Sequence, residues 1–268
     1  MIPAAVRYVR ATSLAAALDA LAEPEARVLA GGQSLLPVLK LRVARPSLLV
    51  DIGGLELRGV ESRNGELHLG ALTPWTELAT APELLRPALA AISECAAEIG
   101  DLQVRNRGTL GGSLAHADPA SDMPAVVLAL GARMQLRSPD GEREIPASDF
   151  FLGPFLTALS ARELLTAVVV PLPAPGSGSA YVSVEHPASG FALAGAAAFI
   201  GPDGGRTIAV TGVADRPFLL PGSDPGEALA AAEIYGDAAA PAEYRRQLAE
   251  VVARRALELA ERRAKEDR

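Results

Sequence analysis

The chain has 268 residues, of which 49% are hydrophobic, 21% charged and only 4% aromatic, enough for two or three small domains with aliphatic cores. Its net charge of −7 argues against general binding to nucleic acid or to an anionic membrane. A single cysteine, Cys95, excludes an internal disulfide and any iron–sulfur cluster ligated by the cysteines of this chain alone.

The first elements predict a strand–helix–strand unit that contains two adjacent glycines. We expect a helix over 11–21, capped by Thr12 or Ser13, and then a strand over 27–30. Gly31 and Gly32 follow, before a helix over 34–41 and a strand over 47–52. Glycine permits left-handed turns and close approach of another molecule to backbone N–H groups, so the pair predicts a nest for an anion.

The middle of the chain predicts a second group of strands and helices around another glycine pair, Gly111 and Gly112. Thr73 is expected to cap a helix with Pro74 at its first position, and residues 101–108 are expected to form a polar connection. The remaining expected elements are a strand over 66–71, helices over 87–99 and 124–130, strands over 132–137, 143–145 and 164–170, and a hairpin turn over 139–141.

The last third predicts an α+β layer. Residues 171–179 contain three prolines, two glycines and two serines, which is typical of a linker. Three strands are expected over 180–185, 192–200 and 207–213, followed by helices over 226–234 and 242–265 that pack on one side of the sheet. The arginines of the last helix alternate with glutamates and are expected to form a solvated face: Arg245, Arg246, Arg254, Arg255, Arg262 and Arg263.

No targeting or metal-binding pattern is visible. The N-terminal residues lack a charged region followed by an apolar one, and no uncharged apolar run reaches about 18 residues. We therefore expect no signal peptide, no membrane span and a cytoplasmic location. Cys95 lies in an alanine-rich helical stretch and is expected to be buried, and the three histidines have no ligand spacing.

The two glycine pairs together suggest an extended phosphate-bearing ligand, such as a dinucleotide, that is held from both sides. Neither pair matches a P-loop, because no Gly-Lys-Ser/Thr follows, and the G-x-G-x-x-G of a Rossmann domain is absent. A dinucleotide site in this chain must therefore have another architecture.

Over nearly its full length, the chain resembles the FAD-binding middle subunits of the molybdenum hydroxylases, the family of xanthine dehydrogenase and aerobic carbon monoxide dehydrogenase. The segments that carry the resemblance are 1–3, 29–35, 102–113, 118–124, 163–167 and 241–245. The resemblance implies an α+β, vanillyl-alcohol-oxidase-type fold. It implies an FAD-binding domain over 1–172, with subdomains at about 1–55 and 56–172, a linker over 173–179, and a C-terminal α+β domain over 180–268 with a three-stranded antiparallel sheet and helices.

The resemblance also implies which residues contact FAD. Leu29, Ala30, Gly31, Gly32, Gln33, Ser34 and Leu35 would wrap the pyrophosphate, and Thr109, Leu110, Gly111, Gly112 and Ser113 would hold it from the other side and support the ribityl chain. Ile99 and Gly100 would border the adenine, Asp122 would accept hydrogen bonds from cofactor hydroxyls, and Leu165 would pack on the isoalloxazine ring. No catalytic and no metal-binding residue is expected. The chain departs from the family at Ser113 (usually Asn), at Gln33 (often His) and at Ser183, where a basic residue often lies near the flavin.

The function that the resemblance implies is electron transfer. The chain would carry FAD and pass electrons from the [2Fe–2S] clusters of a small partner subunit to an external acceptor (NAD, a quinone or oxygen). A large molybdopterin subunit would perform the substrate chemistry, in a dimer of heterotrimers. Two alternatives remain: a self-contained flavin oxidoreductase with Asp122, His116 or His186 as its acid/base group, and a scaffold that has lost its flavin, which only Ser113 and Ser183 favour.

Overall fold

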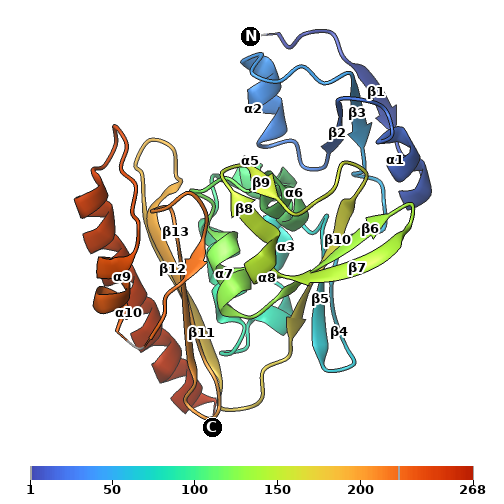
Figure 1. Cartoon of the computed structure of the whole chain (residues 1–268). Helices are drawn as coiled ribbons and strands as arrows, with labels where there is room; N and C mark the ends of the chain where they lie inside the picture. The colour runs from blue at the N-terminus through green and yellow to red at the C-terminus, as the bar shows by residue number, and fades with distance from the viewer. Residues whose placement is uncertain (1, 223, 268) are drawn as a thin grey trace.

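The computed structural model describes residues 2–222 and 224–267, which form three larger sheets and one two-stranded sheet, with helices between and around them (Figure 1). At the N-terminus, β1 (Arg7–Arg10), β2 (Ala26–Leu29) and β3 (Leu48–Asp51) form a parallel sheet in the order β1-β3-β2. Helix α1 (Leu14–Ala20) is capped by Ser13 Oγ, as predicted, and α2 (Leu35–Lys40) follows the first glycine pair. The strand–Gly-Gly–helix–strand unit is confirmed, and β1 is an additional strand.

The middle region is built on a five-stranded antiparallel sheet. Its order is β4-β5-β10-β6-β7, from strands β4 (Val60–Arg63), β5 (Glu66–Gly70), β10 (Leu164–Pro171), β6 (Arg133–Ser138) and β7 (Gly141–Pro146). The other elements are α3 (Trp75–Leu78), the 3₁₀ helix η1 (Pro82–Leu84), α4 (Ala90–Glu98), α5 (Leu102–Arg107), α6 (Leu110–His116), α7 (Met123–Ala129), α8 (Ala147–Phe150) and the two-stranded sheet β8 (Phe151–Gly153) with β9 (Leu156–Thr157).

The third sheet is antiparallel, in the order β11-β12-β13-β14. Its strands are β11 (Gly178–Glu185), β12 (Ala192–Ile200), β13 (Arg206–Thr211) and β14 (Phe218–Leu219), and they are followed by α9 (Pro225–Ala231) and α10 (Ala242–Glu266). The three predicted strands are present, and the two-residue β14 makes a fourth.

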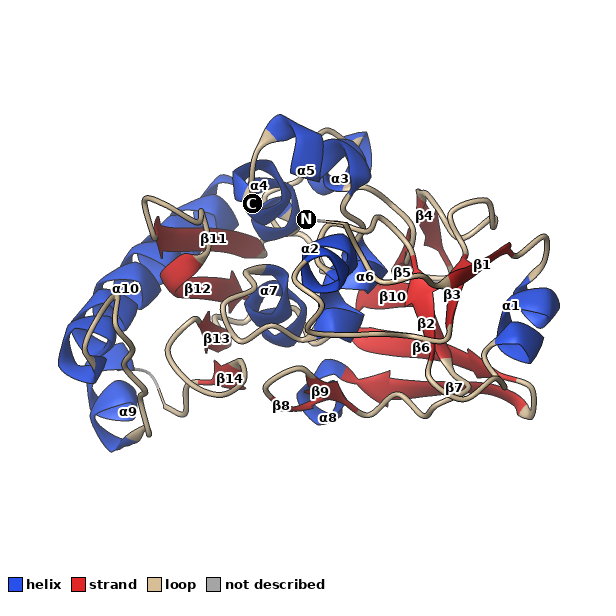
Figure 2. Cartoon of the chain, turned by 90° about the horizontal axis from the view of Figure 1, so that it is seen from above, coloured by secondary structure: helices blue, strands red, loops and turns tan. Residues whose placement is uncertain are grey.

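The sheet of β11–β14 is covered on both faces. Helix α10 packs across β11 and β12 on one face, and α4 and α7 pack on the other, so this sheet joins the C-terminal layer to the middle region (Figure 2). Strand β12 is buried along almost its whole length. Its run of alanines and glycine fits this position, because helices approach from both sides and leave little room for larger side chains.

The boundary between the middle region and the C-terminal layer is closely packed. β10 ends at Pro171 and β11 begins at Gly178. Ser177, just before β11, and Ser179, its second residue, are fully buried. Ser179 Oγ accepts a hydrogen bond from the N–H of Ala91 in α4. The second half of the proline- and glycine-rich segment, 176–179, is therefore packed, whereas Ala174 and Pro175 before it are exposed.

Three local predictions are wrong. The expected polar connection over 101–108 is helix α5, whose N-terminus is capped by the Asp101 carboxylate through the Val104 N–H at 2.8 Å. The Thr73 hydroxyl does not cap α3 but donates to Gly59 O at 3.1 Å. Arg245 is not on a solvated face: it is 7% exposed, and its guanidinium donates to Leu193 O, Gly212 O and Asp237.

Candidate cofactor site

The two glycine pairs are at least 79 residues apart in the sequence, and the segments that contain them, 29–35 and 102–113, lie against each other in the structure. A Cβ added to Gly31 would overlap the carbonyl oxygen of Arg107, at the end of α5, and would lie 2.9 Å from the Gly108 Cα. A Cβ on Gly112 would lie 3.7 Å from the Cβ of Ala30. Figure 1 shows α2, which the first segment precedes, beside α5 and α6. The fold thus brings both predicted motifs to one place.

The first segment presents a row of unused donors. Among the residues that the structure describes, the backbone N–H groups of 30–35 have no protein acceptor, whereas the N–H of the next residue, Leu36, donates to Gly32 O at 3.0 Å. Gly32 has φ +75°, a left-handed conformation that favours glycine. Gln33 Nε2 lies 3.4 Å from Gly31 O and steadies the turn. Successive free N–H groups at a left-handed turn form a concave site for an anion, so this segment fits a diphosphate.

The second segment is not such a nest. Gly111 and Gly112 lie in the first turn of α6, and their N–H groups donate to Ala71 O at 2.8 Å and to Thr109 Oγ1 at 3.2 Å. The N–H groups of Leu110 and Ser113 are also engaged, with Thr73 O and Thr109 O. The expectation of a second set of free backbone donors is wrong. What these glycines provide is close packing, because a Cβ on Gly111 would overlap the side chain of Ala71.

Ile99 and Gly100 are held in place by one arginine. Arg105 Nη1 donates to Ile99 O at 3.2 Å and to Gly100 O at 2.9 Å. Gly100 has φ +52°, and a Cβ there would lie 2.9 Å from the Val104 Cβ. These contacts fix the chain reversal between α4 and α5, which precedes the second glycine segment.

Asp122 is a buried carboxyl group at the start of α7. The Tyr181 hydroxyl, from β11, donates a hydrogen bond to Asp122 Oδ1. Burial raises the pKa of Asp122 to about 7, although the hydrogen bond from Tyr181 lowers it. Ser121, the preceding residue, has its Oγ 3.2 Å from Ser113 Oγ, which connects Asp122 to the second glycine segment. Tyr181 was not among the predicted residues, because an aromatic residue at a strand position reads only as core.

Three other predicted residues, Leu165, His116 and His186, contact residues outside the glycine segments. Leu165 is 5% exposed and lies in β10 opposite Leu136, within the core of the middle region. His116, at the end of α6, contacts Phe155 in a tilted arrangement, with ring centroids 5.1 Å apart and an angle of 57° between the rings. His186 Nδ1 accepts the N–H of Ala188 in the turn between β11 and β12, which is a local structural contact.

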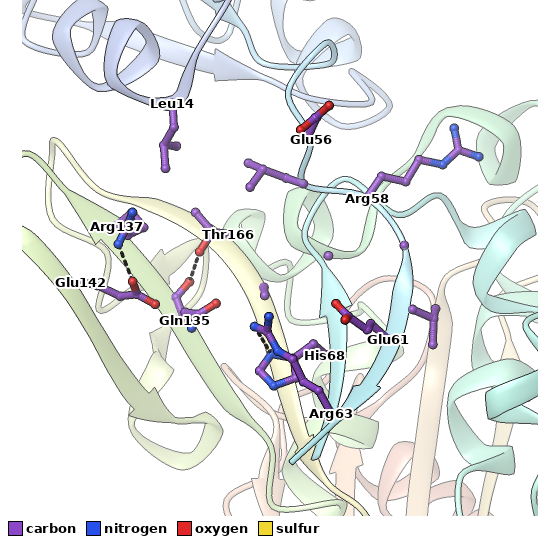
Figure 3. A pocket seen from close by; sticks show the side chains of 15 residues that line it. Leu14, Glu56, Arg58, Glu61, Arg63, His68, Gln135, Arg137, Glu142 and Thr166 are labelled. Atoms are coloured by element: carbon purple, nitrogen blue, oxygen red, sulfur yellow. Dashed lines mark hydrogen bonds and ion pairs between the residues drawn. The ribbon is translucent and has the colours of Figure 1, made fainter. Parts of the chain in front are cut away.

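An open pocket of about 510 Å³ lies between Leu14 of α1 and strands β4, β5, β6 and β10. None of the predicted residues lines it (Figure 3). Its charged lining is mixed in sign: Arg137 pairs with Glu142, and an Arg63 guanidinium nitrogen lies 3.1 Å from His68 Nδ1. Glu56, Arg58 and Glu61 also line the pocket, and Arg58 pairs with Glu77 outside it. Because neither glycine segment lines this pocket, it is not our candidate site.

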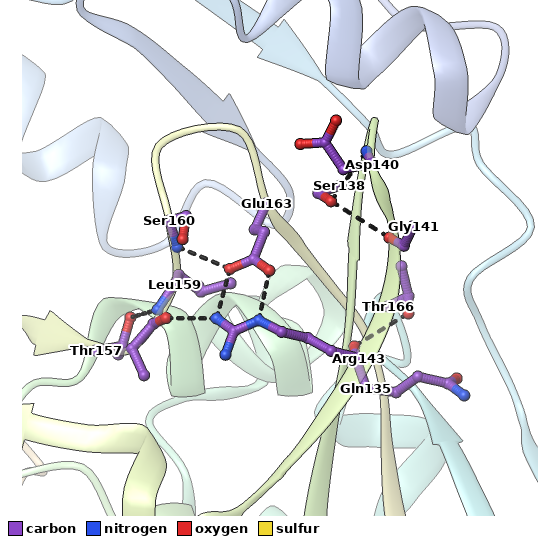
Figure 4. Close-up of polar contacts among 11 residues, drawn as sticks. Gln135, Ser138, Asp140, Gly141, Arg143, Thr157, Leu159, Ser160, Glu163 and Thr166 are labelled. Atoms are coloured by element: carbon purple, nitrogen blue, oxygen red, sulfur yellow. Dashed lines mark hydrogen bonds and ion pairs between the residues drawn. The ribbon is translucent and has the colours of Figure 1, made fainter.

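Glu163, in the segment 163–167 that supported the family resemblance, has a structural role. Arg143 on β7 donates to both of its carboxylate oxygens at 2.7 Å, and the Ser160 N–H donates to Oε2 at 2.9 Å (Figure 4). These bonds lower the pKa of Glu163 to about 2, with Arg143 as the largest cause. The pair fixes the loop that leads into β10.

Cys95 is fully buried in α4, as predicted, and burial raises the pKa of its thiol well above the usual value. Within residues 2–222 and 224–267, no group of three His, Cys, Asp or Glu side chains is arranged to hold a metal ion. No helix in the same ranges is both long and apolar enough to cross a bilayer.

Comparison with known proteins decides the family. Residues 4–173 match the model of the family described as the FAD binding domain in molybdopterin dehydrogenase. The chain belongs to this family. The family resemblance inferred from its motifs is therefore confirmed, and the chain is an FAD-binding medium subunit of the molybdenum hydroxylase type, an oxidoreductase subunit.

Relatives and solved structures agree with this assignment. The chain is 37% identical to the carbon monoxide dehydrogenase medium chain of Afipia carboxidovorans, over 99% of this chain and 100% of the relative. It is 41% identical to the glyceraldehyde dehydrogenase medium chain of Sulfolobus acidocaldarius, over 81% of this chain and 79% of the relative. A crystallised carbon monoxide dehydrogenase of Hydrogenophaga pseudoflava, which lacks the Mo-pyranopterin moiety of the molybdenum cofactor, contains a chain that superposes with a TM-score of 0.93 at 35% identity, over 98% and 99% of the two chains. The predicted α+β FAD-binding fold is thereby confirmed.

Proposed function

We propose that this chain holds FAD against segment 30–35 and passes electrons from the [2Fe–2S] clusters of a small partner subunit to an external acceptor. The observation that carries the proposal is the row of unused N–H groups at 30–35, packed against the α5–α6 segment. Bound FAD would supply the redox chemistry, since a flavin exchanges electrons both singly and in pairs. The chain's own residues would bind and orient it.

Each part of the site has a distinct role in this proposal. The N–H groups of 30–35 donate to the diphosphate, which accepts several hydrogen bonds at once. The side chains of Thr109 and Ser113 would border it from the α6 side. Ile99 and Gly100, whose carbonyl groups accept hydrogen bonds from Arg105, would border the adenine. Asp122 accepts hydrogen bonds from cofactor hydroxyls. The contact of Leu165 with the isoalloxazine ring stays a prediction, because Leu165 is buried in the core of the middle region.

Substrate chemistry is assigned to the partners. The relatives named above are medium chains of dehydrogenases for carbon monoxide and for glyceraldehyde, two unlike substrates. A fold shared between them fits a subunit that handles electrons and FAD while a large molybdopterin subunit binds the substrate. We propose the same division for this chain, in a cytoplasmic dimer of heterotrimers.

The proposed domains follow the sheets. The parallel sheet lies within about 1–55, the five-stranded sheet within 56–172, and the sheet of β11–β14 within 180–268 except for the first two residues of β11. The connecting segment 173–179 is short, and its residues 176–179 are buried. Residues 1–172, which contain the first two of these sheets, would form the FAD-binding domain. Residues 180–268 would cover the cofactor site where Asp122 lies.

The test is purification of the full chain, alone and together with the products of neighbouring genes. We expect the chain to bind FAD, to turn over no substrate alone, and to be reduced by substrate only in the complex. Gly32→Val should lose FAD, because the backbone of a β-branched residue cannot adopt φ +75° without strain. Gly153→Ala, at a position where an added Cβ meets no atom within 4 Å, should retain FAD.

Two results would favour the alternatives. Oxidation of an alcohol or amine by the isolated chain would favour a self-contained flavoenzyme. A chain that stays colourless after incubation with FAD would favour the scaffold and would refute the proposal.

A further inference from the structure

Tyr181 connects the C-terminal sheet to the carboxyl group of Asp122. Tyr181 is 3% exposed on β11, and its hydroxyl donates to Asp122 Oδ1, across 59 residues of sequence. Asp122 itself is only 9% exposed. A buried carboxyl group is costly unless it is hydrogen-bonded, so Tyr181 stabilises this group where it lies.

The surrounding backbone leaves space for this contact. Gly195 on β12 lies beside the tyrosine, and a Cβ there would overlap the Tyr181 hydroxyl and would lie 3.1 Å from Thr211 Cγ2. The segment before Asp122 is anchored to the same sheet, because Thr211 Oγ1 donates to Ser121 O at 2.6 Å and the Gly212 N–H donates to Pro119 O at 3.0 Å. The positions of the tyrosine and of the carboxyl group are thus fixed by separate contacts.

The second oxygen of Asp122 is left available. Within the part of the chain that the structure describes, Tyr181 is the side chain that donates to this carboxyl group. In that part of the chain no hydrogen bond from another residue reaches Asp122 Oδ2, while the backbone N–H of Asp122 interacts with its own carboxyl group and lowers its pKa. A carboxylate oxygen can accept more than one hydrogen bond, so Oδ2 can accept one from a ligand.

We propose that Tyr181 is a positioning residue for FAD, which orients the Asp122 carboxyl group so that its second oxygen meets the cofactor hydroxyls. This inference rests on the proposed function, since it uses the assignment of Asp122 to those hydroxyls. It adds a residue of the C-terminal sheet to the cofactor site. The C-terminal layer then contributes to FAD affinity through one hydrogen bond.

The charges around Asp122 give the hypothesis a pH signature. Burial raises the pKa of Asp122 to about 7, Glu98 and Glu185 raise it further by repulsion, and the Tyr181 hydrogen bond lowers it. An ionised carboxylate is the stronger acceptor, so FAD affinity should fall as the pH drops through about 7. Loss of the tyrosine hydroxyl should move this fall to higher pH. The titratable groups that interact with Asp122 are Cys95 and Glu98 on α4 and Tyr181 and Glu185 on β11.

The test is a titration of the deflavinated full chain with FAD across the range from about pH 5.5 to about pH 9. We expect Tyr181→Phe to bind FAD about tenfold more weakly at neutral pH, the usual effect of losing a hydrogen bond to a charged group. Its pH profile should be shifted upward. Asp122→Asn should have a flat profile, and adding Tyr181→Phe to it should change the affinity little. Tyr244→Phe, an exposed tyrosine of α10, is the matched control and should bind FAD as the unaltered chain does.

Several results would overturn the inference. If Tyr181→Phe lowers FAD affinity as much in the Asp122→Asn background as it does alone, the tyrosine does not act through Asp122. If Tyr181→Phe lowers FAD affinity without shifting the pH profile, the inference is also wrong. Should Tyr181→Phe fail to fold, Gly195→Ala, which displaces the hydroxyl, must produce the same upward shift, and an unshifted profile would reject the inference. If the unaltered chain binds no FAD at any pH, the proposed function itself is wrong, which is a distinguishable result.

Discussion

Gly31→Ala tests whether the contact between the two glycine segments shapes the cofactor site. A Cβ at this position would overlap the Arg107 carbonyl oxygen and would lie 2.7 Å from the Arg107 carbonyl carbon. The oxygen is the closer of the two atoms and lies far inside the 3.0 Å below which a Cβ atom is essentially never found, so the two segments must separate by about 1 Å or more. Both clashing atoms belong to backbone, which cannot move aside as a flexible side chain can.

The expected result is a loss of FAD binding that exceeds the loss of stability. Overpacking of this kind costs about 1–3 kcal/mol of folding free energy. A displacement near 1 Å in a positioned site can cost about a hundredfold in function. We therefore expect Gly31→Ala to fold and to bind FAD about a hundredfold more weakly than the unaltered chain.

The assay is titration of apoprotein with FAD, followed by flavin fluorescence, with thermal unfolding measured in parallel. Gly153→Ala is the matched control, because a Cβ there meets nothing within 4 Å. If Gly31→Ala unfolds normally and binds FAD within about threefold of the unaltered chain, a difference of less than 1 kcal/mol, the packing of segment 30–35 on α5 does not shape the site.

Three further predictions concern the surrounding structure. The folded-state pKa of Glu163 is about 2, below its unfolded value of 4.5, so its pairing with Arg143 stabilises the fold above about pH 4.5 and this contribution is lost as the pH falls towards 2. Arg143→Gln should therefore lower the free energy of unfolding by about 1.5 kcal/mol at neutral pH and much less near pH 2, and urea unfolding at both pH values checks this. Gly195→Ala should lower the melting temperature, and Tyr181→Phe should partly restore it by removing the overlapping hydroxyl; a double variant no more stable than Gly195→Ala alone would contradict this. Cys95 should react with a thiol reagent only after denaturation, since it is fully buried and its pKa is raised; rapid labelling of the native chain would show that α4 opens.

The sequence predicts most of the fold where the local pattern and the tertiary structure agree. The first strand–glycine–helix–strand unit and the strands β10–β13 have clear periodicity or β-branched composition. α5 was missed because its polar residues resemble a loop, and its cap, Asp101, is the only strong local signal. β14, with two residues, is too short for any periodicity.

The candidate site was predictable in part. Gly31 and Gly32 indicate a close approach and a left-handed turn, and both are present. Gly111 and Gly112 give the same local signal of a close approach, but they begin α6. The N–H of Gly111 donates to Ala71 O, forty residues away, so this glycine packs α6 against a distant part of the chain. Tyr181 could not be predicted, because its hydrogen bond to Asp122 depends on how a distant strand packs on α7.

The contact between α10 and α4 has a consequence for how the protein is made. Arg263 of α10 pairs with Glu94 of α4 and donates to Ser179 O at 2.8 Å, contacts that span 169 and 84 residues. During synthesis, segments 29–35 and 99–113 leave the ribosome long before Arg263 does, and N-terminal units generally fold first. The contacts of α4 with α10 therefore form last, and the first two sheets can fold before the C-terminal layer is complete. A chain truncated before α10 would leave Glu94 and Ser179 O without these partners.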